Sequence, residues 1–286
     1  MTSDLIRSVA ARYQSKKKVK TESGQEATIY DYSERQVALR NRRKAQRLEK
    51  LAKKIDALRE QFKKDIKSDD PEVFLTALAV ALIDHTFERV GNPTSADDGH
   101  FGVTGWRRSH ISWSAGGKAS IKYVGKSGVK QLKKITDATV QKALRDAYEA
   151  VEGDDADLFA HDGGKVDASK VNDYLSKFDV TAKDLRGYHA NREMQERLAA
   201  ARKAGGKLPE DKKEREKLLK EEFKAALEAT AGVVGHEAST LRTQYLVPGL
   251  EDQYMKDGTV IEKFDVRTAS TGTIPERVAL RYQRGW

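Results

Sequence analysis

The sequence predicts an α+β fold that is mainly helical and carries one small antiparallel β element. Three observations lead there. Apolar residues recur every three or four positions over long stretches, one central region switches to short β-branched and aromatic runs, and a glycine turn joins those runs. With 286 residues and 38% hydrophobic content, the chain is long enough to bury a substantial core.

The first long helix is expected to begin after Ser33, which can form a capping box with Gln36. Its apolar positions then follow at spacings of three and four: Leu48, Leu51, Ile55, Leu58, Phe62 and Ile66. Asp70 before Pro71 marks the start of a second helix. Because residues 73–83 are nearly all apolar, we expect this second helix at the centre of the core.

The β element is predicted over residues 101–126, as two strands at 103–114 and 119–124 joined by a turn with two glycines. Further helices are expected near 137–150, 167–177, 182–204 and 209–231, the second opened by Asp167 and the third by Thr181. Residues 1–31 are predicted to be a flexible basic arm with one short strand, and residues 32–286 to be the main domain.

The composition favours a polyanionic partner such as nucleic acid, because 53 Lys and Arg face 44 Asp and Glu and give a net charge of +9. The absence of cysteine excludes disulfides, thiolate nucleophiles and Cys-bound zinc. No apolar run reaches the roughly 18 to 20 residues that span a bilayer, and no signal peptide is apparent. We therefore expect a soluble, intracellular protein with no membrane partner.

Candidate catalytic residues lie in three segments that each place a cation or a nucleophile beside a turn or a helix start. Arg89 lies in the first segment, Arg186 in the second, and His236 and Tyr245 in the third. Lys126 lies between the first two segments, at the end of the predicted hairpin. A single such residue specifies little, whereas their order along the chain is more informative.

The order Arg, Lys, Arg, His, Tyr resembles that of type IB DNA topoisomerases of the poxvirus and bacterial kind. The similarity runs from about Ala27 to about Tyr254. The strings that carry it are Arg89 with Gly91 and Asn92; Gly102, Val103 and Thr104 with Arg107, Arg108, Ser109, His110 and Ile111; Val124-Gly125-Lys126; Val171-Asn172-Asp173-Tyr174-Leu175; Thr181-Ala182-Lys183-Asp184-Leu185-Arg186; and Val233-Val234-Gly235-His236 with Tyr245.

The resemblance implies a DNA breaking-rejoining core that relaxes supercoiled DNA through a 3′-phosphotyrosyl intermediate, without ATP, metal or cofactor. It implies that Tyr245 is the nucleophile, that Arg89, Arg186 and His236 hold the scissile phosphate, and that Lys126 is the general acid. Guanidinium groups suit that task because they offer paired donors to phosphate oxygens and keep their charge. The partner would be double-stranded DNA, bound by a monomer.

Helix geometry adds an expectation of its own. His236 and Tyr245 are nine positions apart, which at about 3.6 residues per turn places them on opposite faces of a continuous helix. For both side chains to reach one phosphate, as the resemblance implies, the segment must break or bend between them. Arg186 and His189 lie three apart and share a face, so this helix start is expected to present several donors to DNA.

Other side chains are expected to contact the DNA backbone rather than the bases. They are Arg107, Arg108, His110 and Lys122 in the hairpin region, Tyr188 and Asn191 on the helix after Thr181, and Arg242 near Tyr245.

The sequence also departs from the family pattern. Only about 30 residues precede the first long helix, where relatives carry a fuller β-rich clamp domain, so the chain is either truncated or a minimal form. Gly187 stands where relatives often have Thr or Ser, and residues 249–286 match less well.

Two alternatives stay open at the level of sequence. A tyrosine recombinase uses a similar residue set, but its second arginine lies in a His-x-Leu-Arg string that is not present around Arg186. A noncatalytic basic DNA-binding protein would account for the charge but not for the order of the five residues.

Overall fold

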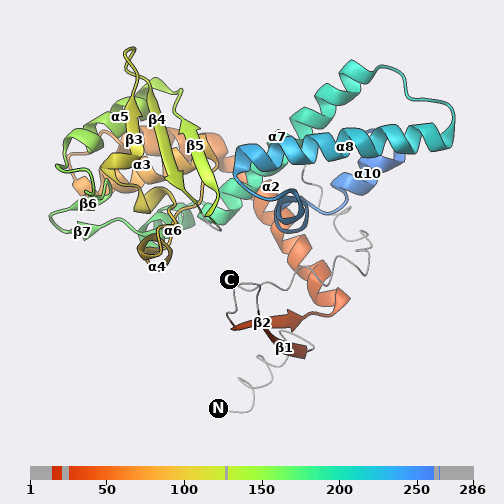
Figure 1. The fold of residues 1–286 in the computed structure, drawn as a ribbon, viewed down its shortest axis with the longest axis horizontal. Helices are drawn as coiled ribbons and strands as arrows, with labels where there is room; N and C mark the ends of the chain where they lie inside the picture. The colour runs from red at the N-terminus through yellow and green to blue at the C-terminus, as the bar shows by residue number, and fades with distance from the viewer. Residues whose placement is uncertain (1–14, 21–25, 126–127, 261–263, 265–286) are drawn as a thin grey trace.

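The fold is mostly helical with small antiparallel sheets, as the sequence predicts. The computed structural model describes residues 15–20, 26–125, 128–260 and 264. Helix α2 (Glu34–Asp65) joins a small hairpin at one end of the molecule to the remainder. On one side lie the main sheet and helices α3, α5 and α6, and on the other lie α8 and α10 (Figure 1). None of the described helices has the length and apolar character needed to span a bilayer.

The start of α2 confirms the predicted capping box. The Ser33 hydroxyl accepts a hydrogen bond from the Gln36 amide at 3.2 Å, and the Gln36 side chain accepts one from the Ser33 amide at 3.0 Å. The apolar stripe of α2 is buried at Leu48, Leu51 and Leu58.

Helix α3 (Pro71–Thr86) is the central core helix that the sequence predicts. The Asp70 side chain accepts hydrogen bonds from the amides of Glu72 and Val73, and almost every residue from Leu75 onward is buried. The helix ends at Phe87, which adopts a left-handed conformation with φ 58°. Residues 88 and 89 therefore follow directly on the most buried helix, with Glu88 still buried and Arg89 partly exposed.

The main sheet is antiparallel in the order β3 (Ile111–Trp113), β4 (Ala119–Val124) and β5 (Lys130–Lys134). The second predicted strand and the turn before it are confirmed, but the first predicted strand, 103–114, was wrong over most of its length. Residues 103–105 form a 3₁₀ turn instead. Their backbone folds onto the segment after α3, where the amides of residues 103 and 104 donate to the carbonyls of residues 89 and 90 at 2.8 and 2.7 Å.

Strand β5 was not predicted, because three of its five residues are lysines. In addition, its apolar residue faces solvent and one of its lysines faces the core, the reverse of the usual pattern. Leu132 is 55% exposed, whereas Lys133 is only 7% exposed and points into the protein.

The remaining helices lie within a few residues of the predicted ranges. They are α5 (Ala138–Glu149), α6 (Ala168–Ser176), α7 (Ala182–Gly205) and α8 (Lys212–Val234). Elements that were not predicted are α4 (Pro93–Asp97), α10 (Leu250–Asp257) and a short hairpin of β6 (Ala160–His161) and β7 (Gly164–Lys165). In the N-terminal arm, β1 (Ser15–Lys20) pairs with β2 (Glu26–Asp31), so two strands form where one was expected.

Helix α7 is tied to α3 by a buried ionic contact. His189 Nε2 lies 2.6 Å from Asp84 Oδ1, and Arg59 of α2 donates to the same carboxylate at 2.9 Å. Burial alone would raise the pKa of Asp84, but the hydrogen bonds and charges of His189 and Arg59 hold it below its usual value. The expectation that His189 faces DNA beside Arg186 was therefore wrong, because His189 is buried and stacks on Phe87.

Candidate active site

Arg89 lies in the segment that follows the C-terminus of α3. Two glycines let the segment 102–104 pack against it, because a Cβ on Gly102 would lie 2.7 Å from the Cα of Gly91 and 2.8 Å from the carbonyl oxygen of Arg89. Gly91 itself has φ +114°, a conformation that favours glycine. The backbone that carries Arg89 is thus held by its close packing against residues 102–104.

Arg186 lies in the second turn of α7 and is the most deeply buried cation of the site, with 2% of its side chain exposed. Its Nε donates to the carbonyl of Phe87 at 2.7 Å, and one terminal nitrogen donates to the carbonyl of Val234. These contacts join the ends of α3 and α8 through one guanidinium, because the last carbonyls of a helix have no partner within it.

The helix is interrupted around His236, so His236 and Tyr245 do not lie on one continuous α-helix. Helix α8 ends at Gly235, which is left-handed at φ 70°, and His236 lies in the turn that follows. A new helical segment, α9 (Ala238–Thr240), widens into the π-helical turn η4 (Leu241–Tyr245). This break returns Tyr245 to the side on which His236 lies.

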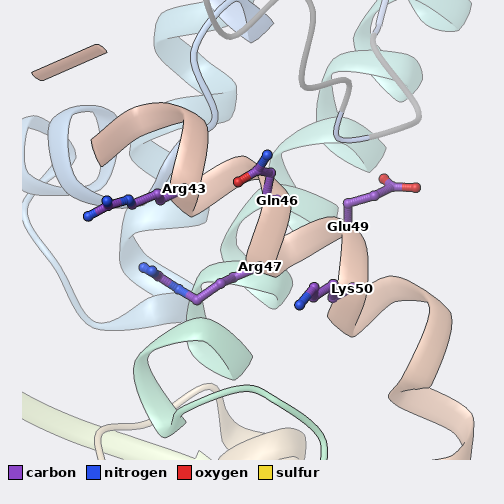
Figure 2. A pocket seen from close by; sticks show the side chains of 5 residues that line it. All are labelled: Arg43, Gln46, Arg47, Glu49 and Lys50. Atoms are coloured by element: carbon purple, nitrogen blue, oxygen red, sulfur yellow. The ribbon is translucent and has the colours of Figure 1, made fainter. Parts of the chain in front are cut away.

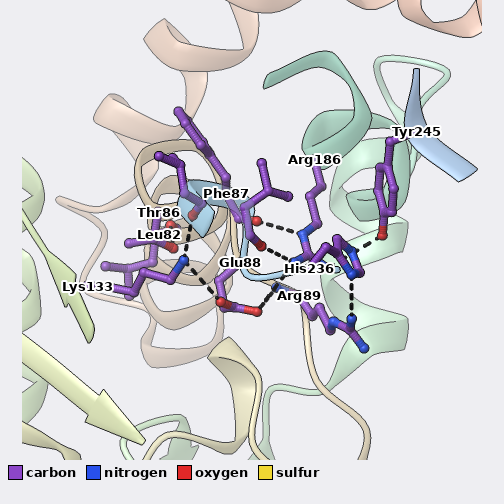
Figure 3. Close-up of polar contacts among 11 residues, drawn as sticks. Leu82, Thr86, Phe87, Glu88, Arg89, Lys133, Arg186, His236 and Tyr245 are labelled. Atoms are coloured by element: carbon purple, nitrogen blue, oxygen red, sulfur yellow. Dashed lines mark hydrogen bonds and ion pairs between the residues drawn. The ribbon is translucent and has the colours of Figure 1, made fainter. Parts of the chain in front are cut away.

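Four of the five predicted catalytic residues come together in space (Figure 3). Arg186 donates to the Tyr245 hydroxyl at 3.4 Å, and Arg89 donates to Nδ1 of His236 at 3.2 Å. The rings of His236 and Tyr245 are 4.8 Å apart, centroid to centroid. Lys126, the fifth residue, lies outside the described residues.

The exposure of the four residues indicates how a substrate would approach. Tyr245 is 5% exposed and Arg186 is 2% exposed, whereas Arg89 and His236 are half-buried and form the outer edge. Burial, followed by the charge of Arg186, lowers the pKa of Arg89. A phenol beside two guanidinium groups and an imidazole is suited to attack on a centre that develops negative oxygens.

Asn191 of α7 holds the Tyr245 turn in place. Its side-chain nitrogen donates to the carbonyls of Gly187 and Tyr245 at 2.7 and 2.9 Å, and its oxygen accepts from the Val247 amide at 2.8 Å. Asn191 is fully buried, and its side-chain amide binds backbone groups of the protein. It does not face outward, as the predicted DNA contact would require.

The other predicted DNA contacts occupy varied positions. Lys122 is exposed on β4, and Tyr188 is buried against Phe264. Arg107 pairs with Asp155 at 3.2 Å.

The remaining three also have partners within the protein. Arg108 stacks over Tyr148, and His110 accepts a hydrogen bond from the Arg107 amide at 3.0 Å. Arg242 is exposed and pairs with Glu251.

Sequence analysis missed a group of cations next to Tyr245, which we call the basic cleft. It has a volume of about 330 Å³ and contains Arg40, Arg43, Lys44 and Arg47 of α2 and Lys183 of α7. Figure 2 shows that Arg43 and Arg47 point to the same side of α2, in a neighbouring hollow of about 420 Å³. The signal was present in the sequence, since residues 40, 43, 44 and 47 recur at helical spacing.

Lys44 is the least solvated cation of the basic cleft. Its Nζ donates to the carbonyl of Leu246, next to Tyr245, at 2.7 Å. Burial and the charges of Lys183, Arg40 and Arg47 lower the pKa of Lys44 to about 7. Among the described residues, Asp184 is the carboxylate that lines the cleft, and it is already paired with Arg47 at 2.8 Å.

No group of three His, Asp or Glu side chains that could hold a metal ion occurs within the part of the chain that the structure describes.

Comparison with known proteins identifies a family for the chain. The family model described as "Eukaryotic DNA topoisomerase I, catalytic core" matches residues 12–262. The chain is also 26% identical over 198 residues to "DNA topoisomerase 1" of Candida albicans. That match covers 68% of this chain but only 24% of the Candida albicans protein, so the chain spans about a quarter of its relative's length.

The close packing of Gly102 on the Arg89 segment gives a first testable prediction. Gly102→Ala should lower the free energy of unfolding by about 1 to 3 kcal/mol, because its Cβ meets backbone atoms that cannot move away independently. Gly187→Ala is the matched control, since its Cβ would meet Leu48 at an ordinary 3.5 Å. Within helix α7 that change should raise stability by up to about 1 kcal/mol. Equal denaturant midpoints for the two variants would contradict this packing.

Proposed function

Because the chain belongs to the eukaryotic DNA topoisomerase I catalytic core family, we propose that it relaxes supercoiled DNA by cutting and rejoining one strand. The observation that carries the proposal is the meeting of Arg89, Arg186, His236 and Tyr245, which come from separate parts of the sequence. Such a convergence is not needed by a protein that only binds DNA.

In the proposed reaction the Tyr245 oxygen attacks a backbone phosphorus. A bond forms between the phenol oxygen and phosphorus, the bond from phosphorus to the 5′ oxygen breaks, and a 3′-phosphotyrosine results. The Arg186 guanidinium, which already donates to the phenol, stabilises the phenolate as the phenolic proton passes to a water molecule of the solvent. Rejoining is the reverse displacement, and it needs no ATP because the phosphotyrosine retains the energy of the phosphodiester.

We assign the binding of the nonbridging oxygens of that phosphate to Arg89 and His236, and their position at the outer edge of the group supports this role. The departing 5′ oxygen must gain a proton. We assign that step to Lys126 on the similarity of the Val124-Gly125-Lys126 string to the topoisomerase pattern.

Further parts of the proposal rest on sequence similarity and charge. The motif strings favour the poxvirus and bacterial subtype, acting as a monomer on double-stranded DNA inside the cell, in the cytoplasm or nucleoid. Residues 32–286 would form the catalytic domain. Residues 1–31 would be a basic arm, the remnant of an N-terminal DNA-clamp domain. The exposed side chains of Lys16, Lys17 and Lys18 on β1 suit that role.

The basic cleft is a further proposed contact with the DNA backbone. Its cations exceed its acids and it adjoins the Tyr245 turn, so a phosphate bound there would lie close to the cut site. Such a contact carries no base preference, because it involves phosphate alone.

The nucleophile is tested by Tyr245→Phe. We expect loss of plasmid relaxation in EDTA without ATP, and a fall in covalent DNA capture of about 10⁴-fold or more, as for other lost nucleophiles. Salt-sensitive DNA binding should persist, because the cations remain. Tyr148→Phe, in a tyrosine that packs on Trp113 away from the cluster, is the control. Continued cleavage by Tyr245→Phe would refute the assignment, and relaxation that needs paired sites would indicate a recombinase.

The proposed acid is tested by Lys126→Ala on two substrates. Cutting of an ordinary strand should slow by about 10² to 10⁴-fold, because the 5′ oxygen leaves without a proton. Cutting of a strand with a 5′ thiolate leaving group should slow far less, since a thiolate needs no proton to depart. Lys142→Ala, in an exposed lysine of α5, serves as the control. Equal slowing on both substrates would remove Lys126 from the acid role.

The basic cleft is tested by the protons that accompany DNA binding. Because the pKa of Lys44 lies at about 7, Lys44 is mostly neutral at pH 8. A phosphate in the cleft should raise that pKa, so binding should take up a fraction of a proton, measurable by calorimetry in buffers of different ionisation enthalpy. Affinity should accordingly weaken as the pH rises from 7 to 9, as linkage requires. Lys44→Met should abolish the uptake and Lys50→Met should preserve it; unchanged uptake in Lys44→Met would exclude the cleft.

A further inference from the structure

Two buried charges behind the candidate active site have no role in the mechanism described so far. The side chains of Glu88 and Lys133 are 3% and 8% exposed, and Glu88 Oε2 lies 3.4 Å from Lys133 Nζ. Neither residue was among the sequence-based candidates. A buried ion pair is weak evidence for stability, since the loss of hydration offsets much of the attraction.

Glu88 contacts both arginines of the site. Its Oε1 accepts a hydrogen bond from the amide of Arg89 at 2.9 Å and lies 3.8 Å from a terminal nitrogen of Arg186. One carboxylate therefore fixes the backbone that carries the first guanidinium and neutralises part of the charge of the second (Figure 3).

Lys133 extends the same network to the third functional residue. Its Nζ donates to the carbonyl of Val233 at 2.9 Å, and Arg186 donates to the carbonyl of the next residue, Val234. These carbonyls end α8 immediately before Gly235 and His236. Lys133 thus ties the turn that presents His236 to the carboxylate that holds Arg89.

The charges in this region are closely balanced. Burial lowers the pKa of Lys133, and Glu88 opposes that shift. Burial and the same carboxylate raise the pKa of Tyr123, so this neighbouring phenol stays neutral. The Glu88 carboxylate thus faces two buried cations, Arg186 and Lys133. Without this carboxylate, the two cations would repel each other in a poorly hydrated space.

We propose that Glu88 and Lys133 are a positioning pair, which sets the orientation of Arg89, Arg186 and His236 toward the reacting phosphate. The inference rests on the proposed function for its chemical consequence. Both residues act through the three they hold, so they are positioning residues and not catalytic ones. Displacement of such groups by about 1 Å can cost about 100-fold in rate.

The test compares Glu88→Gln and Lys133→Met with the double variant that carries both changes. Each single change leaves a buried charge without its partner, so both should lower the melting temperature. The double change removes both charges with little change in shape and should restore part of that stability, because Arg186 still lacks its carboxylate partner. Glu149→Gln and Lys130→Met, in exposed residues of α5 and β5, are the matched controls.

The decisive readout is the rate of single-turnover strand cleavage at saturating DNA. We expect the double variant to bind DNA within about 3-fold of the unaltered protein but to cleave about 100-fold more slowly, because its guanidiniums are no longer oriented. A folded double variant that cleaves at the normal rate would overturn the proposal. A double variant that fails to fold would also overturn it, by assigning the pair a structural role.

A second readout does not depend on cleavage. Arg186 Nε donates to the carbonyl of Phe87, so its N–H should exchange slowly with solvent in nitrogen-resolved NMR. In the folded double variant this N–H should exchange faster, and unchanged protection would overturn the inference. Should the unaltered protein cleave no DNA, the proposed function would fail, while this measurement would still decide whether the pair holds Arg186.

Discussion

The geometry of the candidate site depends on the hydrogen bonds of one buried guanidinium. Arg186 donates to the last residues of two helices, at Phe87 and Val234, and to the hydroxyl of Tyr245. An arginine can do this because its donors lie in one rigid plane and its charge persists under all ordinary conditions. A lysine at the same position would present a single nitrogen and could not join three separate segments at once.

Helix ends supply the other constraints. Arg89 follows the end of α3, His236 follows the end of α8, and Tyr245 closes a π-helical turn. At each of these places the backbone has groups without an intrahelical partner, and side chains such as Asn191 and Lys133 bond to them. The groups that satisfy the helix termini are therefore the same groups that fix the positions of the functional residues.

The sequence predicted the structural features that depend on local chemistry. The caps at Ser33, Asp70 and Thr181 and the central core helix all follow from short-range rules. The break before Tyr245 was expected for another reason, because His236 and Tyr245 were both assigned to one phosphate. The sequence could not predict features that depend on distant partners. Lys133 is buried and Leu132 is exposed because the Lys133 ammonium binds the carboxylate of Glu88 and a carbonyl at the end of α8. No residue pattern within β5 indicates these distant partners. The first predicted strand failed likewise, because residues 103 and 104 bond to the Arg89 segment rather than to a strand.

The excess of positive charge explains why a closed site of this kind suits phosphoryl transfer. Around Tyr245 the cations Arg89, Arg186 and Lys133 face the carboxylate of Glu88, and burial, followed by the charge of Arg186, lowers the pKa of Arg89. Folding holds these like charges together in a poorly hydrated space, so their repulsion is already present before any substrate binds. In the proposed reaction, a phosphate whose oxygens gain charge during the attack would relieve that repulsion most at the transition state. The interaction would then be stronger there than with the uncut strand, which is the condition for catalysis rather than for binding alone.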